Sequence, residues 1–436
     1  MGIKKAIIFG MPRIGLSMVL GIEGFSVFAL YTIGYQVTPF LVGLALSIGY
    51  ISIAFFSFLF GWISDRKYTK WGRRKPYIII FAPVIGFSFI FLMLPSLLLP
   101  DMDNKVIIFI WLLIWEILFK ASYGIIVPYQ AWMAEQFDIN ERPKVSQIQN
   151  TFNLLGTLFY WSYTYLVLTQ VFDQISTNPN VLPFSFIIPI CLFGILTIIL
   201  FCLNAFLMPI EPRTKIKSTL KEILIICVKN KNFMAVAITI GLSSIAWVII
   251  TTQMLPFFES VLNLELSEYL LIFSFNFFCI IIFLEIWRRV IQKYGKKQTM
   301  LFIYILAALI LPITLLGLIP LNNFLLIGLL FMFGIGASLG GWYLLPAVIF
   351  ADLAEYDERT TGELKAGTYT GVPSIFLNIF QALGVFLLGA LNELPQITVG
   401  SFSYSMGLII WSPICSLILI IAFLYTRKYL ILDLEK

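Results

Sequence analysis

Three ionisable side chains interrupt long apolar runs of the sequence. Glu23 lies near the middle of one run, and Glu116 and Lys120 straddle the middle of another. A charge at the centre of a bilayer costs about 2.5 to 3.5 kcal/mol even on insertion scales, so such a residue normally faces a partner or a water-filled cavity. A buried carboxyl group can take a proton from one side of a membrane and release it to the other. These three residues are therefore the predicted site of proton or ion coupling.

Two pairings of these residues are possible. Glu116 and Lys120 are four residues apart with the acid first, which favours an ion pair on one helix face. Glu23 is then the unpaired, desolvated carboxyl that carries the proton, which is our working hypothesis. In the other pairing Glu23 binds Lys120 across two helices as a structural link or substrate clamp, and Glu116 is the group that titrates.

A second set of residues consists of amides and aromatic rings on helices expected to line a cavity. An aromatic face beside amide groups suits a sugar ring, which stacks its apolar face and hydrogen-bonds at its rim. The alternative is that the rings lie at the membrane interface or in packing contacts, and that Gly334, Gly336 and Gly340 permit close helix contact. The predicted substrate-binding residues are Gln130, Asn150, Trp247, Gln253, Trp342, Tyr343, Asn378 and Gln381.

The elements that must position these residues are membrane-spanning helices. The 436 residues are 60% hydrophobic and 12% charged, against roughly 25% charged in a soluble domain. Apolar runs of about 20 residues, each long enough to cross a bilayer as a helix, follow one another along the chain. The predicted spans are 14–36, 40–63, 76–99, 106–132, 146–170, 183–208, 233–256, 266–287, 298–319, 323–349, 367–391 and 402–426.

The basic residues predict the orientation of these spans. With the exceptions of Lys105 and Lys120, the 29 Lys and Arg residues fall on the side of the N-terminus. Because basic loops stay on the cytoplasmic side, both termini are expected in the cytoplasm of a multi-pass protein of the cell membrane. The same bias explains the basic loops without nucleic-acid binding, and no removable signal peptide is expected.

Two pairs of similar loops indicate an internal repeat. KYTKWGRRKPYI around Gly72 is similar to IQKYGKKQTM around Gly295, and PYQAWMAEQFDINER is similar to PAVIFADLAEYDER. The predicted fold is thus all-α and integral to the membrane, with 12 transmembrane helices in two parallel six-helix repeats around a central cavity. Its parts are an N-terminal half, a central cytosolic loop and a C-terminal half, at 1–208, 209–232 and 233–436.

Charged residues in these repeated loops are candidates for gating. Asp65 at the inner end of the second span is expected to accept hydrogen bonds from loop guanidinium groups and so to lock the cytosolic face. In the alternative interpretation the basic residues only set topology and meet anionic lipid. The predicted gating residues are Gly61, Asp65, Arg66, Gly72, Arg73, Arg74, Asp352, Asp357 and Arg359.

The loop sequences also resemble a known family. GWISDRKYTKWGRRKPYI, residues 61–78, resembles the second-to-third loop of the major facilitator superfamily in the form found in glycoside-pentoside-hexuronide:cation symporters such as melibiose permeases, with plant sucrose transporters as near relatives. FADLAEYDERTTGELKAGTYTG, residues 350–371, is similar to that family's tenth-to-eleventh loop. The resemblance implies symport of a sugar or glycoside.

The family's functional charges do not coincide with charges in this sequence. Its two cation-binding aspartates on helix two fall on Ile53 and Ser57, and its helix-four aspartate falls on Ile126. Its helix-five arginine falls near Asn150, and its helix-eleven lysine falls near Leu377 or Asn378. Sodium coupling of the melibiose type is therefore not expected.

The expected function is secondary active transport by alternating access, as a proton- or cation-coupled symporter of a sugar-like solute. A carrier of lysolipids or other amphiphiles and a non-transporting membrane sensor are the alternatives. The chain lacks histidine and shows neither a metal-ligand cluster nor a nucleophile with a base, so we expect no enzyme activity, cofactor or metal. The expected partners are the solute, a proton or another cation and the lipid bilayer, with the protein monomeric.

Overall fold

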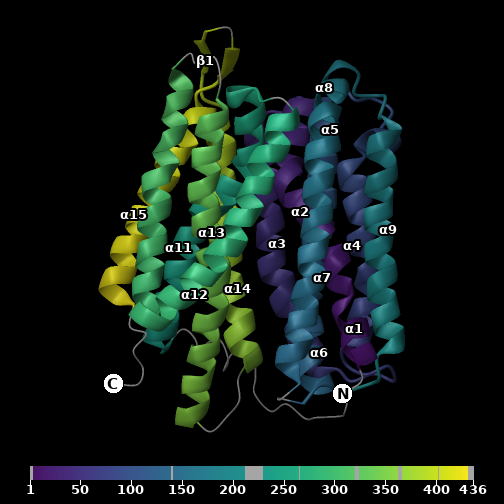
Figure 1. Ribbon diagram of the computed structural model, residues 1–436. Coiled ribbons are helices and arrows are strands. Elements are labelled where there is room, and N and C mark those ends of the chain that lie inside the picture. The colour runs from purple at the N-terminus through teal and green to yellow at the C-terminus, as the bar shows by residue number, and fades with distance from the viewer. Residues whose placement is uncertain are drawn as a thin grey trace. The chain divides into compact units, whose positions relative to one another are not determined.

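The computed structural model describes residues 3–138, 141–211, 229–264, 266–319, 324–361, 366–400 and 402–430. The chain forms two compact units, Met1–Ser218 and Thr219–Lys436. Figure 1 shows that each unit consists of long helices running side by side. Most of the predicted central loop, at 212–228, lies outside the described residues.

In the N-terminal unit the helices follow the predicted spans closely. Proline in the first turn, where its missing N–H is not needed, starts α2, α3, α4 and α7, and the Asn104 side chain caps α5. The helices of this unit are α1 (Ile3–Gly10), α2 (Pro12–Ala29), α3 (Pro39–Arg66), α4 (Lys75–Met93), α5 (Lys105–Tyr123), α6 (Ile126–Gln136), α7 (Arg142–Tyr163), α8 (Thr169–Thr177) and α9 (Phe184–Leu207). Shorter helical turns are η1 (Leu30–Gly34), η2 (Pro95–Leu97) and η3 (Thr164–Leu168).

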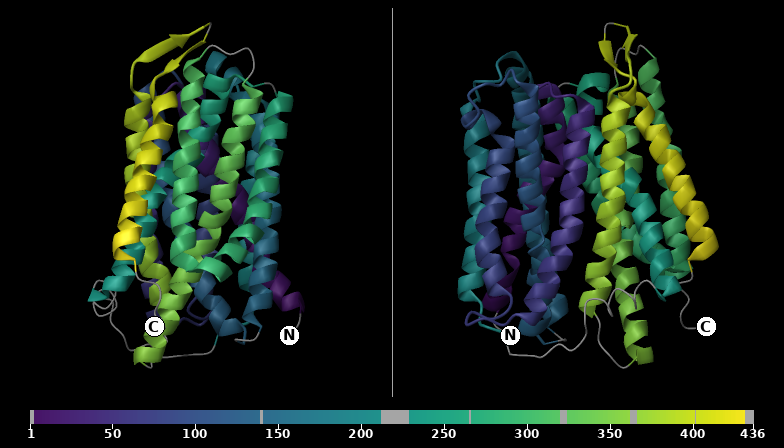
Figure 2. Two further views of the ribbon diagram at one scale, coloured as in Figure 1. Left: turned by 60° about the vertical axis from the view of Figure 1, so that its left-hand side comes forward. Right: turned by 180° about the vertical axis from the view of Figure 1, so that it is seen from behind.

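The C-terminal unit is also a bundle of long helices. Its elements are α11 (Lys231–Phe257), η4 (Phe258–Leu262), α12 (Leu266–Ile310), η5 (Leu311–Leu318), α13 (Leu325–Thr361), α14 (Ala366–Asn392), β1 (Gln396–Val399), β2 (Phe402–Ser405) and α15 (Gly407–Tyr429). In each unit the first long helix packs against the last two: α2 packs against α7 and α9, and α11 packs against α14 and α15. Likewise α3 and α4 pack against α5, and α12 packs against α13 and α15. Figure 2 shows both bundles from two further sides.

Gly295 divides α12 into two helical stretches. Its backbone, at φ 80° and ψ 168°, is not helical, and it separates the predicted spans 266–287 and 298–319. Gly72, in the similar loop of the N-terminal unit, also has a positive φ, of 93°. Glycine enters this region without the steric cost that a side chain carries. The two loops therefore share both their sequence pattern and the conformation of their glycine.

Two predictions of where a helix begins or ends were wrong. The last span begins at Gly407 rather than at residue 402, because Gln396–Val399 and Phe402–Ser405 pair as an antiparallel hairpin with Gly400 at positive φ in its turn. α13 runs to Thr361, so Asp352, Asp357 and Arg359 lie on a continued helix rather than in a loop. The predicted span 106–132 agrees with one candidate span, Lys105–Met133, which comprises α5 and most of α6 with a break near Gly124.

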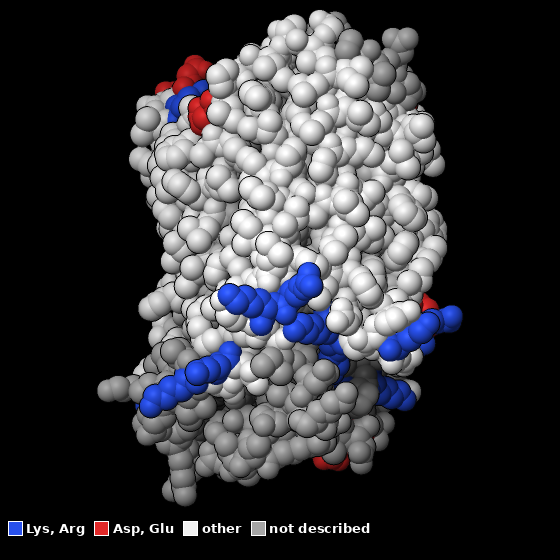
Figure 3. All heavy atoms as spheres, turned by 90° about the vertical axis from the view of Figure 1, so that its left-hand side faces the viewer, with Lys and Arg blue, Asp and Glu red and all other residues white. Residues whose placement is uncertain are grey.

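The described helices have the length and composition of membrane spans. Ten of them are long and apolar enough to cross a membrane, and one of the ten covers both stretches of α12. The predicted span 146–170, which falls on α7, is not among the ten. On the face in Figure 3, described Lys and Arg side chains gather in a band toward the lower end, below a broad surface without described charged residues.

Candidate functional site

Glu23, Glu116 and Lys120 meet inside the N-terminal unit. Glu23 comes from α2, and the other two come from α5. Nζ of Lys120 lies 2.6 Å from Oε2 of Glu23 and 3.9 Å from Oε1 of Glu116. The side chains of Glu23 and Lys120 are each 3% exposed, and that of Glu116 is 0% exposed. Their charges therefore act on one another with little screening by solvent. We call this group the buried triad.

α3 completes the surroundings of the buried triad. The ring of Tyr50 lies 4.5 Å from Nζ of Lys120, a cation–π contact that helps to hold the ammonium group in place. One residue earlier, a Cβ atom on Gly49 would lie 2.5 Å from Oε1 of Glu116. The absence of a side chain at Gly49 therefore makes the space that the Glu116 carboxyl occupies.

The structure has the second of the two pairings considered from the sequence. Glu23 holds Lys120 across two helices, and neither carboxyl oxygen of Glu116 has a hydrogen-bond partner among the described residues. The working hypothesis that Glu23 is the unpaired carboxyl is wrong for this conformation, because the Lys120 ammonium group lies closer to the acid on the neighbouring helix than to the acid one turn away. The carboxyl groups of Glu116 and Glu23 also lie close enough for their charges to interact.

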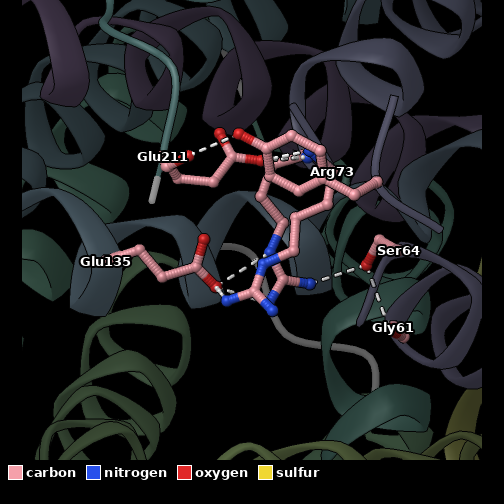
Figure 4. Close-up of polar contacts among 7 residues, drawn as sticks. Gly61, Ser64, Arg73, Glu135 and Glu211 are labelled. Carbon is pink, nitrogen blue, oxygen red and sulfur yellow. Dashed lines mark hydrogen bonds and ion pairs between the residues drawn. The ribbon is translucent and has the colours of Figure 1, made fainter. Parts of the chain in front are cut away.

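A second charged group lies at the loop between α3 and α4. Nη2 of Arg73 and Nη2 of Arg74 each lie 2.6 Å from Oε1 of Glu135, near the end of α6. Nη1 of Arg74 also donates to Oγ of Ser64 at 2.7 Å. Figure 4 shows Glu135 and Ser64 on opposite sides of the guanidinium groups. One carboxylate thus joins α6 to the loop that follows α3.

Glu211 fastens the residues after α9 to the same loop. Its Oε1 accepts hydrogen bonds from the backbone N–H groups of Arg73 and Arg74, the latter at 2.9 Å. A Cβ atom on Gly72 would lie 2.7 Å from both Glu211 carboxylate oxygens, so glycine permits this approach as well as the positive φ. Arg73, Arg74, Glu135 and Glu211 together form what we call the loop cluster.

Sequence analysis found the basic half of the loop cluster but missed its acids. Glu135 lies in the second pair of similar loops, and that similarity is the signal that could have identified it. Among the other predicted gating residues, Gly61 packs against Val127 and Arg66 is exposed over the Trp62 ring. The side chains of Asp65, Asp352, Asp357 and Arg359 lie outside the part of the chain that the structure describes.

The predicted solute-binding residues differ in their burial and in the contacts that their side chains make. In the N-terminal unit Gln130 is half-buried and Asn150 is exposed. In the C-terminal unit Trp247 and Trp342 stack with ring centroids 5.7 Å apart, and Nε1 of Trp247 is buried without a described hydrogen-bond partner. Tyr343 is 59% exposed.

The predicted amides of the C-terminal unit are partly committed to structure. Gln253 and Asn392 exchange two hydrogen bonds, of 2.8 and 3.1 Å, between α11 and α14. Asn378 donates to the backbone of Ser374 one turn earlier, and Gln381 is half-buried. Gln253 is therefore a structural residue in this conformation.

The glycines of α13 have the packing role considered from the sequence. A Cβ atom on Gly336 would lie 3.0 Å from Cβ of Cys279, and a Cβ atom on Gly340 would lie 3.0 Å from the backbone oxygen of Ile280; both neighbours are on α12. A Cβ atom on Gly334 would lie 2.3 Å from Ile310. Within the described residues no three His, Cys, Asp or Glu side chains gather as a metal site requires.

Solved transporter structures share this fold. A nucleoside transporter, NupG, is 16% identical with a TM-score of 0.68, covering 98% of this chain and 100% of that chain. A D-xylose-proton symporter is 13% identical with a TM-score of 0.71, covering 99% of each chain. The E. coli fucose:proton symporter, FucP, is 12% identical with a TM-score of 0.58, covering 98% of each chain. No curated protein matches the sequence significantly.

The family that matches the sequence agrees with the fold. The model of the family described as MFS/sugar transport protein matches residues 8–429, nearly the whole chain. This match confirms the resemblance to the major facilitator superfamily that the loops 61–78 and 350–371 indicated. The chain therefore belongs to the MFS/sugar transport protein family.

Proposed function

We propose that this protein is a secondary active transporter that couples the movement of a sugar-like solute to protons by alternating access. The observation that carries the proposal is Glu116, a fully buried carboxyl group without a described hydrogen-bond partner beside the Glu23–Lys120 pair. An ionised carboxyl in this position is costly, whereas its protonated form is neutral. Glu116 is therefore the proposed proton carrier.

The buried triad gives this carrier an exchange partner. When Glu116 is protonated, Lys120 is left to Glu23 alone; when Glu116 loses its proton, two carboxylates compete for one ammonium group. Nζ of Lys120 already lies 3.9 Å from Glu116, so a small shift moves it from one acid to the other. The triad thus has two arrangements that differ by one proton. Coupling of proton binding to a conformational change requires two such states.

The solute class is supported by relatives and by aromatic geometry. The chain belongs to a family of sugar transport proteins, and two of the similar structures are a D-xylose-proton symporter and a fucose:proton symporter. In the C-terminal unit the stacked rings of Trp247 and Trp342, with the unpartnered Nε1 of Trp247, offer an apolar face and a hydrogen-bond donor. That combination suits a sugar ring.

The finer architecture belongs to the same proposal. We propose twelve spans in two six-helix repeats, joined by the segment 209–232, in the cell membrane with both termini in the cytoplasm, and a monomeric protein. The matching packing of α2 and α11 and the positive φ of Gly72 and Gly295 support the repeat. The loop cluster is the proposed gate, because it ties three segments of the N-terminal unit together through buried charges.

Proton flux into proteoliposomes tests this function. Adding the right member of a sugar panel should raise the external pH in vesicles that contain the protein, and Glu116→Gln should abolish that signal because glutamine does not ionise. Glu285→Gln is the matched control, since Glu285 is an exposed carboxyl that bonds Arg288 and Arg289. Solute entry that moves no protons, equal in Glu116→Gln and the parent protein, would rule out the coupling proposed here.

A further inference from the structure

Arg13 is a cation inside the N-terminal unit that has no acidic partner among the described residues. It lies on α2, ten residues before Glu23. Its Nη2 donates to Oδ1 of Asn153 on α7 at 3.4 Å, a long hydrogen bond, and its Nε is buried without a partner. No ion pair to Arg13 occurs among the described residues, in contrast to Lys120, Arg73 and Arg74.

Arg13 lies too deep to be an ordinary interfacial arginine. Asn153 follows Arg142, the first residue of α7, by eleven positions, which is about 16 Å along a helix. On the other side Gly15 touches Thr197, ten residues before the end of α9, or about 15 Å. The hydrocarbon core is about 30 Å thick, so the guanidinium group stands at a depth where a lone charge is costly.

The exposed surface of α7 is polar up to Thr151 and apolar from Leu154 to Phe159, and Arg13 contacts the helix between these two parts. α7 is not among the described helices that are apolar enough to span a membrane, and its exposed residues include Gln147, Asn150 and Thr151. Lipid tails offer these amides no hydrogen bonds, whereas a water-filled path does. Asn150 and Asn153 are three residues apart and so neighbours on one face of the helix.

We propose that Arg13, with Asn153 and Asn150, binds an anionic group of the transported solute, a carboxylate or a phosphate carried by a sugar. A guanidinium group presents paired N–H donors that match the oxygens of either anion, and the neighbouring amides supply further donors. The bound anion would satisfy the Nε–H group and neutralise a charge that forms no ion pair with the described residues. This inference rests on the proposed transport function and narrows its substrate to acidic sugars.

The proposal also gives a charge balance for coupling. With Glu116 protonated and Glu23 paired to Lys120, the charges at membrane depth in the N-terminal unit leave Arg13 as one net positive charge. A monoanionic group cancels that charge. Binding a proton and an anion together therefore leaves these charges balanced. The change between the outward-facing and inward-facing states is then favoured when both are bound or when neither is bound.

The test compares matched solutes in proteoliposomes of the full chain. Tracer uptake of methyl glucoside, methyl glucuronide and glucose 6-phosphate is measured for the parent protein, Arg13→Gln and Arg13→Lys. Lys4→Gln, at an exposed residue on α1, controls for loss of a positive charge. We expect uptake of an acidic sugar with a KM about tenfold or more higher in Arg13→Gln, because a charge-assisted hydrogen bond is lost. Arg13→Lys should fall between, and Lys4→Gln should match the parent.

Other outcomes separate the possible failures. Uptake of methyl glucoside alone, unaffected by Arg13→Gln, would overturn the anion site and leave sugar transport standing. If the folded parent protein takes up no member of a wide sugar panel, both the anion site and the proposed sugar transport are overturned. An effect of Arg13→Gln that appears only in vesicles containing phosphatidylglycerol, whatever the solute, would show that a lipid headgroup rather than the solute occupies the site. If Arg13→Gln does not fold, Arg13→Lys decides, since it keeps the charge and loses the paired donors.

Discussion

A Cβ atom on Gly49 would lie 2.5 Å from Oε1 and 2.8 Å from Cγ of Glu116. The acid on α5 thus occupies space that α3 leaves open by having glycine at this position. Since the carboxyl group has no described hydrogen-bond partner there, the fit is steric rather than polar. A carboxyl group that is placed by shape and by the charge of Lys120 at 3.9 Å, without a hydrogen bond, can change its protonation state, as the proposed carrier must.

Gly49→Ala should disturb the carrier. The added methyl group forces the Glu116 carboxyl to move, at a cost of about 1–3 kcal/mol for overpacking. We expect a lower thermal stability in detergent and fewer protons taken up per solute. Gly24→Ala is the matched control: Gly24 lies next to Glu23 on α2, and its Cβ would meet nothing within 4 Å. Equal effects of the two substitutions would contradict the fit.

Removing the ammonium group of the buried triad should destabilise the protein strongly. Lys120→Met leaves Glu23 without the partner that it has at 2.6 Å, and breaking a buried pair costs about 3–5 kcal/mol. The double variant Lys120→Met with Glu23→Gln should recover much of that loss, because no buried charge is then left unpaired at Glu23. Unfolding in detergent micelles measures both, and a double variant as unstable as Lys120→Met would argue against the pair.

The sequence predicted the members of the buried triad but not their pairing. Charges within apolar runs are visible in a single sequence, because ionisable residues at membrane depth are rare. Which acid binds Lys120 depends on how α2 packs beside α5, and spacing along one helix favoured Glu116. The space at Gly49 and the role of Gln253 depend equally on neighbours far apart in the chain.

Helix positions were predicted better than loop contacts for a similar reason. Apolar runs define helices locally, so α9 and α11 begin and end within two residues of the predicted spans. The hairpin after α14 was missed, because the alternation around Gly400 is short and continues into an apolar run. Arg13 was counted only as an orientation signal, since its lack of an acidic partner appears only in three dimensions.

Neutralising Glu135 should loosen the loop cluster. Glu135→Gln leaves the guanidinium groups of Arg73 and Arg74, 5% and 3% exposed, without the carboxylate that both contact. We expect a loss of about 2–5 kcal/mol in stability or faster cleavage of the loop by protease. Asp138→Asn removes an exposed acid three residues later and should change neither property. Indistinguishable variants would show that the cluster contributes little.

Gly72 and Gly295, which both have a positive φ, should respond differently to alanine. Both substitutions strain the backbone, by about 1–2 kcal/mol, but only at Gly72 would the new methyl group meet another residue, the Glu211 carboxylate at 2.7 Å. At Gly295 nothing described lies within 4 Å. Gly72→Ala should therefore lower the unfolding temperature more than Gly295→Ala does. The reverse order would contradict the fastening of Glu211 to this loop.

Gln253 and Asn392 allow a structural role to be separated from a binding role. Gln253→Leu leaves the Asn392 side chain with only its bond to the backbone of Leu388, which should cost about 0.6–2 kcal/mol. The double variant with Asn392→Leu should restore stability and solute affinity together, because no buried amide is then left without its partner. Asn276→Leu, at a buried amide on α12 that is not among the predicted solute contacts, provides the comparison for loss of a single amide. Stability that returns in the double variant while affinity stays low would instead mean that Gln253 contacts the solute, since packing alone cannot account for an affinity loss in a protein of restored stability.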